Sequence, residues 1–158
     1  MHPCSLELRD GHVCYRHNEA VVWNLPVASI RVIGEATTSN GPYVDDYYFC
    51  FATGPDSWYE ASFYAEGTKE FLKSLGSALG YELQLRLLGS TDFESNVLWP
   101  PHLAGKPMFT FIPVPPSTWL SRLFDIGENK QWFSDDVERE LASSPTSIAN
   151  LMQRREAT

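Results

Sequence analysis

Asp10-Gly11 separates two short runs, SLELR and HVCYR, in which apolar and polar residues alternate. Such alternation is typical of a strand with one buried face, and Asp-Gly between two alternating runs is a strong signal for a tight hairpin turn. If Asp10 and Gly11 form the turn, Arg9 lies opposite His12, and the register of the whole hairpin follows. One face of the hairpin then carries the side chains expected in the core, namely Leu6, Leu8, Val13 and Tyr15.

The chain up to residue 65 continues in the same manner. Four further segments have the alternation or the β-branched and aromatic content of strands: 20–25, 28–38, 44–53 and 57–65. Turn residues separate them, since Pro26 and the sequences NGP and GPD each interrupt a regular strand. In the second of these segments we expect Ile30 and Val32 on one face. The first 65 residues therefore predict six antiparallel strands.

The hydrophobic period changes after residue 66. Apolar residues recur at helical spacing in GTKEFLKSLGSALG, which predicts a helix over 67–80. Thr68 is expected as the N-cap of this helix and Gly80 as its C-terminal stop. The following YELQLRL alternates again, with three leucines on one face. This pattern fits either a strand or an extended segment that covers the core.

The chain beyond Gly89 has a different character. LWPPHLAGKPMFTFIPVPPSTW holds six of the eleven prolines, which excludes a regular central strand there, and only 108–112 resembles a strand. Short helices are expected over 118–126, over 134–142 with Ser134 as N-cap, and near the C-terminus. We therefore divide the chain into a domain over 1–90 and a proline-punctuated extension over 91–158 that packs on it.

Two runs carry a resemblance to a known family. VVWNLPVASIRVIGEATTSNGPYVDDYYFCF, followed by GTKEFLKSLGSALGYEL, resembles a group of small, mostly uncharacterised bacterial pleckstrin-homology-like (PH-like) domain proteins. The shared pattern is a tryptophan that ends one strand, an I-x-V strand, a turn with GP and DD, and a helix with paired leucines. It corresponds here to Trp23, Ile30, Val32, Thr37, Gly41, Pro42, Asp45, Asp46, Leu72 and Leu75.

The resemblance implies a mainly β (α+β) fold, an antiparallel barrel or bent sheet capped by one α-helix. It does not imply a function. PH domains that bind phosphoinositides use Lys and Arg side chains in the loop between their first two strands. Here that loop is the tight turn RDGH, which carries one acid, so we expect no phosphoinositide binding.

The charge distribution constrains the class of partner. The net charge is −8, and residues 1–66 hold nine acids against three bases. Nucleic acids and anionic membranes bind through Lys and Arg, so the acidic first half disfavours both and favours a basic protein partner. The start of the chain lacks the pattern of a signal peptide, and no apolar run is long enough to span a membrane. We expect a cytoplasmic protein whose three cysteines stay reduced.

One set of residues has the chemistry of a zinc site. His2, Cys4, His12, Cys14 and His17 all lie in or beside the predicted hairpin, and zinc prefers tetrahedral nitrogen and sulfur ligands. The register places Cys4 opposite His17 on one face and directs His12 and Cys14 to the other. Ligands that are divided between two faces of a sheet cannot surround one ion, so we expect no metal or other cofactor.

The candidate catalytic residues are few. Asp45 and Asp46 are neighbours in a predicted strand, so their side chains point to opposite faces and cannot form a convergent pair. His102 lies in the proline-rich loop WPPHLAG and, with an acid, is the basis for a less favoured alternative, a small hydrolase. No nucleophile motif or phosphate-binding loop is present in the sequence. We therefore expect a protein that is not an enzyme.

Large aromatic side chains occupy both faces of the strands YYFCF and SWYEASFY, so either the C-terminal extension or a partner must cover the outer face. Tyr and Trp are frequent interface anchors, and acids beside them steer a basic surface. The expected partner-binding residues are Tyr43, Asp45, Asp46, Asp56, Trp58 and Glu60. The favoured hypothesis is a non-catalytic immunity protein that binds and neutralises a basic toxin domain, and the alternative is a PH-like adaptor for another protein or peptide.

Overall fold

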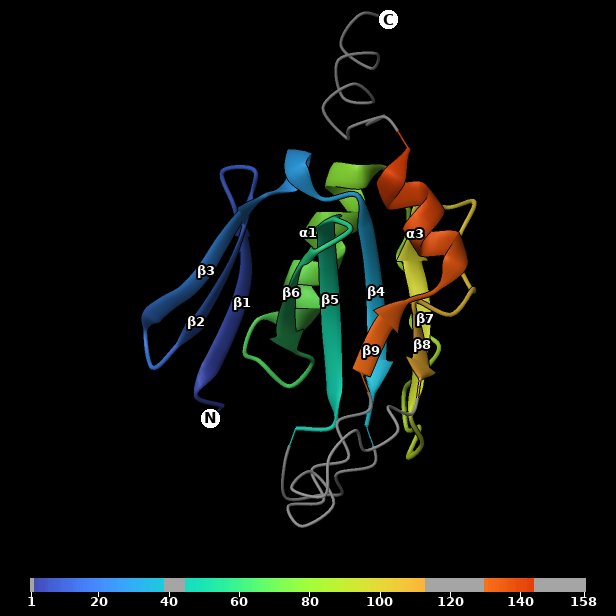
Figure 1. Ribbon diagram of the computed structural model, residues 1–158. Helices are drawn as coiled ribbons and strands as arrows, with labels where there is room; N and C mark the ends of the chain where they lie inside the picture. Colours follow the sequence, from blue (N-terminus) through green and yellow to red (C-terminus); the bar gives the residue numbers. More distant parts are fainter. Residues whose placement is uncertain (1, 39–44, 113–129, 144–158) are drawn as a thin grey trace, which may run out of the picture.

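The computed structural model describes residues 2–38, 45–112 and 130–143, and this part of the chain is mainly β, with three antiparallel sheets and two α-helices (Figure 1). The first sheet has the order β1-β2-β3, the second β6-β5-β4-β7, and the third is the hairpin β8-β9. The strands are β1 (Cys4–Arg9), β2 (His12–His17), β3 (Ala20–Pro26), β4 (Val32–Thr37), β5 (Tyr47–Gly54), β6 (Ser57–Ser62), β7 (Glu94–Trp99), β8 (Phe109–Ile112) and β9 (Lys130–Phe133). The helices are α1 (Thr68–Leu79) and α3 (Asp135–Ala142), and a short 3-10 turn, η1 (Val27–Ser29), joins β3 to β4.

The first hairpin has the predicted register. Arg9 pairs with His12 and Leu6 with Tyr15, and the two turn residues Asp10 and Gly11 both have positive φ values, 51° and 73°. Two positive φ values are the requirement of the tight turn that matches the twist of a hairpin. The predicted face is also the core face, since Leu6 and Val13 are buried while Leu8 and Tyr15 pack against the core. Local turn chemistry thus explains this element.

The segment between β3 and β4 differs from the prediction. A strand was expected over 28–38, but Val27–Ser29 form η1 and the strand begins at Val32. Ile30 consequently packs in one core cluster and Val32 in another, so the expectation that they share a face is wrong. The 3-10 turn interrupts the alternation, which shifts the two side chains to different sides of the sheet.

The C-terminal part of the chain contains more strands than the sequence predicted. The strand at 108–112 is confirmed as β8, but β7 and β9 were not expected. β7 pairs only with β4 and is the edge of the four-stranded sheet, so Pro100, directly after its last residue, removes no donor from the sheet ladder. The many prolines led us to expect no central strand in this part of the chain. That expectation does not conflict with β7, because β7 is an edge strand.

Helix α1 begins where two segments come close together. Its N-cap is Gly67, with φ of 83°, and not the predicted Thr68, whose hydroxyl donates to Ala65 O at 2.7 Å. A Cβ atom on Gly67 would lie 2.8 Å from Leu6 O, so the close approach of β1 requires glycine. Gly80 ends the helix in the left-handed conformation, as predicted.

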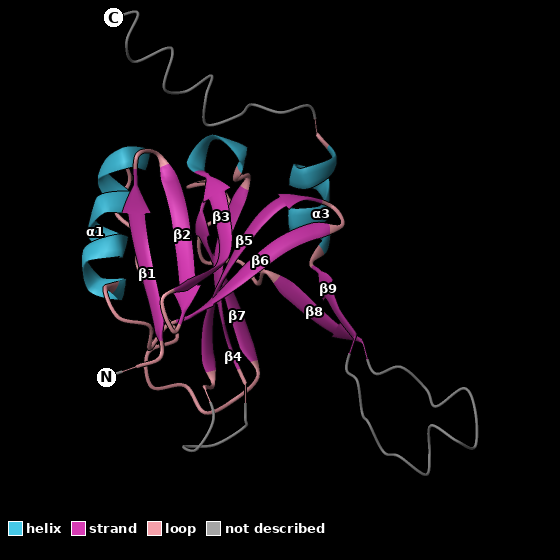
Figure 2. Ribbon diagram, turned by 90° about the vertical axis from the view of Figure 1, so that its left-hand side faces the viewer, coloured by secondary structure: helices cyan, strands magenta, loops and turns pink. Residues whose placement is uncertain are grey.

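Two apolar cores lie on the two sides of the four-stranded sheet. Figure 2 shows α1 and the three-stranded sheet on one side, and the β8-β9 hairpin with α3 on the other. The first core, between the two larger sheets and α1, consists of Cys4, Leu6, Val13, Leu25, Val27, Ile30, Ile33, Phe49, Phe51, Ala61, Ala65, Phe71, Leu75, Leu98 and Trp99. The second core consists of Val32, Ala36, Cys50, Ala52, Val97, Leu103, Met108, Phe109, Phe133, Val137 and Leu141.

The outer face of β5 is therefore covered by the chain itself. Phe49 and Phe51 belong to the first core and Cys50 and Ala52 to the second, as the alternation of a strand requires. Side chains of β8, β9 and α3 lie over Cys50 and Ala52. The extended segment after α1 is not a strand, and Leu83 and Leu85 pack on the first core, which agrees with the covering role that the sequence left open.

The described strands do not close into a barrel, although a backbone bridge joins β1 to the chain just after β6. Leu6 N donates to Glu66 O and Glu66 N donates to Cys4 O, both at 2.9 Å, so β1 is bridged to the segment that follows β6. The mainly β (α+β) class is as expected, and a closed barrel is not what these strands form.

The predicted helix over 134–142 is present as α3, whereas those expected over 118–126 and near the C-terminus lie outside the described residues.

Candidate functional site

A groove with two tryptophans lies between the turn that joins β5 to β6 and the C-terminal elements β9 and α3. It is lined by Pro55, Asp56, Trp58, Trp132, Phe133, Glu138 and Ala142. Its volume is about 460 Å³, within the range of pockets that hold small ligands. We call this set of residues the tryptophan groove. It joins residues that are far apart in the sequence.

The aromatic wall of the groove is held by ring packing. The Trp58 ring lies edge-on to Phe133 at a centroid distance of 5.2 Å and to Phe109 at 6.4 Å. Phe109 and Phe133 stack on one another at 5.4 Å across the β8-β9 hairpin. Although it packs on these rings, Trp58 remains 40% exposed and Trp132 is 47% exposed. Large exposed side chains that come together in one hollow mark a candidate interaction site.

Carboxylates surround the aromatic wall. Asp56 and Glu138 line the groove, and Glu60 Oε1 accepts a hydrogen bond from Trp58 Nε1 at 3.3 Å. Within the described part of the chain, neither Asp56 nor Glu138 forms an ion pair, and no Lys or Arg lines the groove. The charged groups among the described lining residues are therefore all carboxylates, which favours a cationic ligand.

Helix α3 forms one side of the groove, and an arginine fixes it to the sheet. The Arg31 guanidinium donates to the carbonyl oxygens of Glu140 at 2.6 Å and of Ser143 at 2.8 Å, and also to that of Leu141. These are the last carbonyls of the helix, which have no partner within it. At the other end, Ser134 is the N-cap residue, as predicted, but its hydroxyl donates to Pro107 O at 2.7 Å and makes no capping bond to the helix.

The described members of the predicted partner-binding set fall into two groups at opposite ends of β5. Asp56, Trp58 and Glu60 lie at or beside the tryptophan groove. Asp45 and Asp46 precede the eight-residue strand β5 and Asp56 follows it, which separates the two acidic sets by roughly 25 Å. Tyr43 lies outside the described residues.

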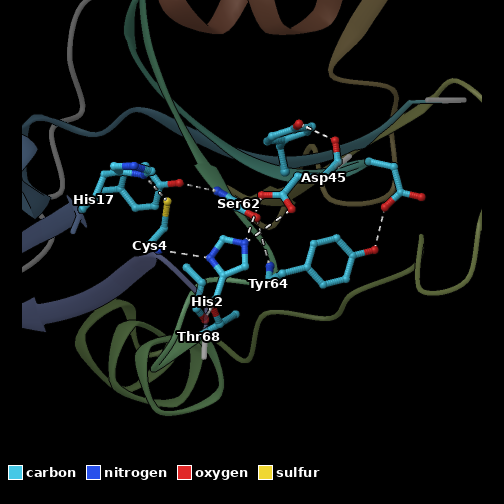
Figure 3. Close-up of polar contacts among 11 residues, drawn as sticks. His2, Cys4, His17, Asp45, Ser62, Tyr64 and Thr68 are labelled. Atoms are coloured by element: carbon cyan, nitrogen blue, oxygen red, sulfur yellow. Dashed lines mark hydrogen bonds and ion pairs between the residues drawn. The ribbon is translucent and has the colours of Figure 1, made fainter. Parts of the chain in front are cut away.

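Asp45 and Asp46 each have a partner of their own, and Figure 3 shows Asp45 close to His2. Asp45 Oδ2 lies 3.3 Å from His2 Nε2, and Asp46 Oδ1 accepts a hydrogen bond from the Tyr64 hydroxyl at 2.6 Å. The bond to Asp46, with a smaller contribution from burial, raises the pKa of Tyr64 to about 12. The two carboxylates therefore bind to different segments and share no site.

The histidines and cysteines of the first hairpin are arranged as the register requires. Cys4 lies opposite His17, and its Sγ atom is 3.3 Å from His17 Nδ1 (Figure 3). His12 instead contacts the Asp10 carbonyl oxygen. Among the described residues, no three His, Cys, Asp or Glu side chains are placed to hold a metal ion.

A hollow of about 750 Å³ lies beside His2 and Arg16, whose side chains are already paired with Asp45 and Glu7.

His102 has an acidic partner, Glu140 of α3, whose Oε2 atom is 3.0 Å from His102 Nε2. The histidine side chain is 61% exposed. Within the described residues, no hydrogen bond joins His102 to a serine, threonine or cysteine side chain. The pair has the residue types of a catalytic dyad, without a nucleophile hydrogen-bonded to it in the described part of the chain.

A buried carboxyl group that the sequence reasoning did not single out lies on β4. Glu35 is fully buried and accepts hydrogen bonds from Arg86 N at 2.7 Å, from Asn96 Nδ2 at 2.8 Å and from the Tyr47 hydroxyl. Burial and the bond to Glu35 raise the pKa of Tyr47 well above its ordinary value. Its three donors come from three segments, so Glu35 joins β4, β5 and β7 to the chain after α1. The signal for it was a single acid within the otherwise apolar VIGEAT.

Trp132 and Glu138 were also missed as groove residues. Their sequence signal was the pair Trp132-Phe133 directly before an acidic helix.

Comparisons with protein-family models, with curated proteins and with solved structures find no match. No helix in the described ranges has both the length and the apolar character needed to cross a bilayer. The function must therefore be argued from the site itself.

Proposed function

We propose that the protein is a non-catalytic, PH-like protein-binding module whose tryptophan groove binds a basic protein partner. The favoured partner is a basic domain of a bacterial toxin, so that the protein acts in the cytoplasm as an immunity protein. The observation that carries the proposal is the combination, in one groove, of two exposed tryptophans with two carboxylates that lack ion-pair partners among the described residues.

The physical chemistry of interfaces supports this choice. Tryptophan is enriched among the residues that contribute most to protein–protein affinity, and it does so at the centre of a contact that excludes water. Acids around such a centre accelerate association with a basic surface and disfavour acidic competitors. The net charge of −8 extends the same preference to the whole chain. A toxin domain that acts on nucleic acid is often basic, which is the reason for naming this class of partner.

The PH-like part of the proposal rests on element order. Six antiparallel strands up to Ser62 are followed by α1, and the two larger sheets enclose the first core with α1. The order of a bent sheet followed by one helix is that of the PH-like class. A fold of this class is compatible with many functions, so it supports a scaffold for the groove and nothing more specific.

The non-catalytic part rests on the roles of the titratable groups. Asp45 and Asp46 are engaged by different segments, and Glu35 is buried among donors from its own chain. One contact favours a different function, since His102 and Glu140 form the pair that a small hydrolase would use. That alternative predicts loss of the biological effect on His102→Ala with unchanged thermal stability.

Affinity capture from the native host tests the proposal. Wild-type protein is compared with the double variant Asp56→Lys/Glu60→Lys and with the matched control Glu70→Lys/Glu82→Lys, which has the same change in charge at two exposed acids at or just after α1. A basic protein retained by the wild type and the control, and lost with the groove variant, is the expected result. Expression of that protein alone must then arrest growth, and co-expression must restore it.

The outcomes separate the alternatives. Equal retention by all three proteins would remove the groove as the binding surface. A retained basic protein without toxicity would replace the immunity role with that of an adaptor. A biological effect that depends on His102 and not on the groove would favour the hydrolase.

A further inference from the structure

We infer that the tryptophan groove binds a single arginine side chain of the partner, with the guanidinium against Trp58 and hydrogen-bonded to Asp56 and Glu138. This inference rests on the proposed function, since it names the group by which a basic protein partner is recognised. It follows from the shape of the groove, from the placement of its charges and from the properties of the guanidinium group.

The groove has room for one long side chain. At about 460 Å³ it is too small for a folded segment, and its lining includes the apolar side chains of Pro55, Phe133 and Ala142. Such walls accept the methylene stem of a basic side chain while its charged end stays near the carboxylates. An interface of ordinary size therefore extends beyond the groove, which supplies one anchoring point.

The charges of the groove come from two separate elements. Asp56 belongs to the turn between β5 and β6, and Glu138 to α3, which Arg31 holds in place. Two carboxylates on different elements can accept hydrogen bonds from different N–H groups of one planar cation. An apolar side chain in the same position would leave both carboxylates partly desolvated and without a partner, which is unfavourable.

The orientation of Trp58 adds to the preference for a cation. Its indole N–H is bonded to Glu60, and the edge-on contacts with Phe133 and Phe109 hold the ring. Because this donor is already engaged, the ring of Trp58 and not its N–H is the group left to recognise a ligand in the groove. Tryptophan attracts cations over its ring more strongly than the other aromatic residues do, and arginine is the more frequent partner.

Arginine fits this site better than lysine does. The guanidinium is planar, is weakly hydrated and has five N–H donors in a fixed arrangement, whereas the lysine ammonium is a compact and strongly hydrated charge. The planar guanidinium can stack on an indole and at the same time donate hydrogen bonds to two carboxylates. The groove should therefore distinguish arginine from lysine, and distinguish both from a neutral side chain of the same shape.

The test measures binding of small probes to the whole protein by heteronuclear NMR. The probes are the Nα-acetyl amides of arginine, lysine and citrulline, because citrulline has the shape of arginine without its charge. Arginine should shift the indole N–H signals of Trp58 and Trp132 and leave those of Trp23 and Trp99 unchanged. We expect arginine to bind roughly tenfold more tightly than citrulline, with lysine in between.

Three variants complete the test. Asp56→Asn and Glu138→Gln should each weaken arginine binding several-fold, and Glu82→Gln, at an exposed acid outside the groove, should not change it. Signal dispersion in each spectrum reports whether the variant is folded. Equal binding of citrulline and arginine, or an absence of shifts at Trp58 and Trp132, would overturn the inference.

Failure of this inference is distinguishable from failure of the proposed function. If a basic protein is captured in a groove-dependent manner but arginine does not bind, the function stands and the anchor is a different group. If arginine binds but no basic protein is retained from the host, the groove recognises a cation and the proposed protein partner is wrong.

Discussion

Glu35 shows how a single residue can join several segments of the fold. Its carboxyl group accepts hydrogen bonds from Arg86 N, Asn96 Nδ2 and the Tyr47 hydroxyl in the interior. We expect Glu35→Gln to lower the free energy of unfolding by about 2 kcal/mol, because the amide N–H₂ replaces an acceptor and leaves a buried donor without a partner. Chemical denaturation of the two proteins measures the difference.

The control for this prediction is Glu7→Gln. Glu7 is a partly exposed acid that pairs with Arg16 on the first hairpin, and such pairs contribute little to stability. A loss of stability as large for Glu7→Gln as for Glu35→Gln would contradict the assigned role of the buried network.

Tyr64 gives a prediction about pH. Its hydrogen bond to Asp46 raises the pKa of the hydroxyl from 10.0 to about 12 in the folded protein. Because the folded state holds the proton more tightly than the unfolded state, this contribution to stability is fully present below pH 10 and is lost as the pH rises toward 12. The difference in unfolding free energy between the wild type and Tyr64→Phe should therefore shrink over that interval. A difference that is constant across the interval would mean that the bond to Asp46 is absent in solution.

At the scale of elements, Arg31 connects α3 to the four-stranded sheet. Arg31→Ala removes its hydrogen bonds to the last carbonyls of the helix, and bonds of this charge-assisted kind contribute about 2 kcal/mol. We expect faster hydrogen exchange of the α3 amides, with that of β1 and β2 less affected. Arg9→Ala, at an exposed arginine of the first hairpin, is the control, and equal exchange of α3 in both variants would contradict the role of Arg31.

The elements differ in how far local sequence specifies them. The first hairpin and α1 depend on turn and cap residues close to them in sequence, and both agree with the prediction apart from the N-cap of α1. β7 and β9 depend on strands that are distant in sequence, and the local pattern did not predict them. The local pattern also did not predict the break at η1, which interrupts the alternation and places Ile30 and Val32 in different cores.

At the scale of the whole molecule, the two cores share one sheet. Phe51 faces the first core and Cys50 the second, so neither core can separate without the central strands. We expect one cooperative unfolding transition, and Leu141→Ala in the second core should lower the stability of the first core as well. The free energy of unfolding should fall by about 3 kcal/mol, which is typical when a buried leucine is replaced by alanine.

Two probes check this cooperativity. Trp23 contacts Phe51 and Tyr59 in the first core, so its indole N–H signal in heteronuclear NMR spectra reports on the part of the molecule distant from Leu141. Its transition should coincide with that of far-ultraviolet circular dichroism in the wild type and in Leu141→Ala. The exposed Leu88 supplies a control in Leu88→Ala. Two separate transitions would mean that the C-terminal elements unfold independently.

The sequence by itself determined the mainly β class, the register of the first hairpin, the helix after the sixth strand and the acidic character of the chain. These properties follow from periodicity, turn chemistry and charge, which act between residues close in sequence or need no structure. Only the tertiary structure decided that C-terminal elements cover the outer face of β5, and that Asp56 and Trp58 meet Glu138 while Asp45 and Asp46 lie elsewhere. The physical reason is that contacts between distant segments depend on which apolar faces pack together, and one chain's local pattern does not specify that choice.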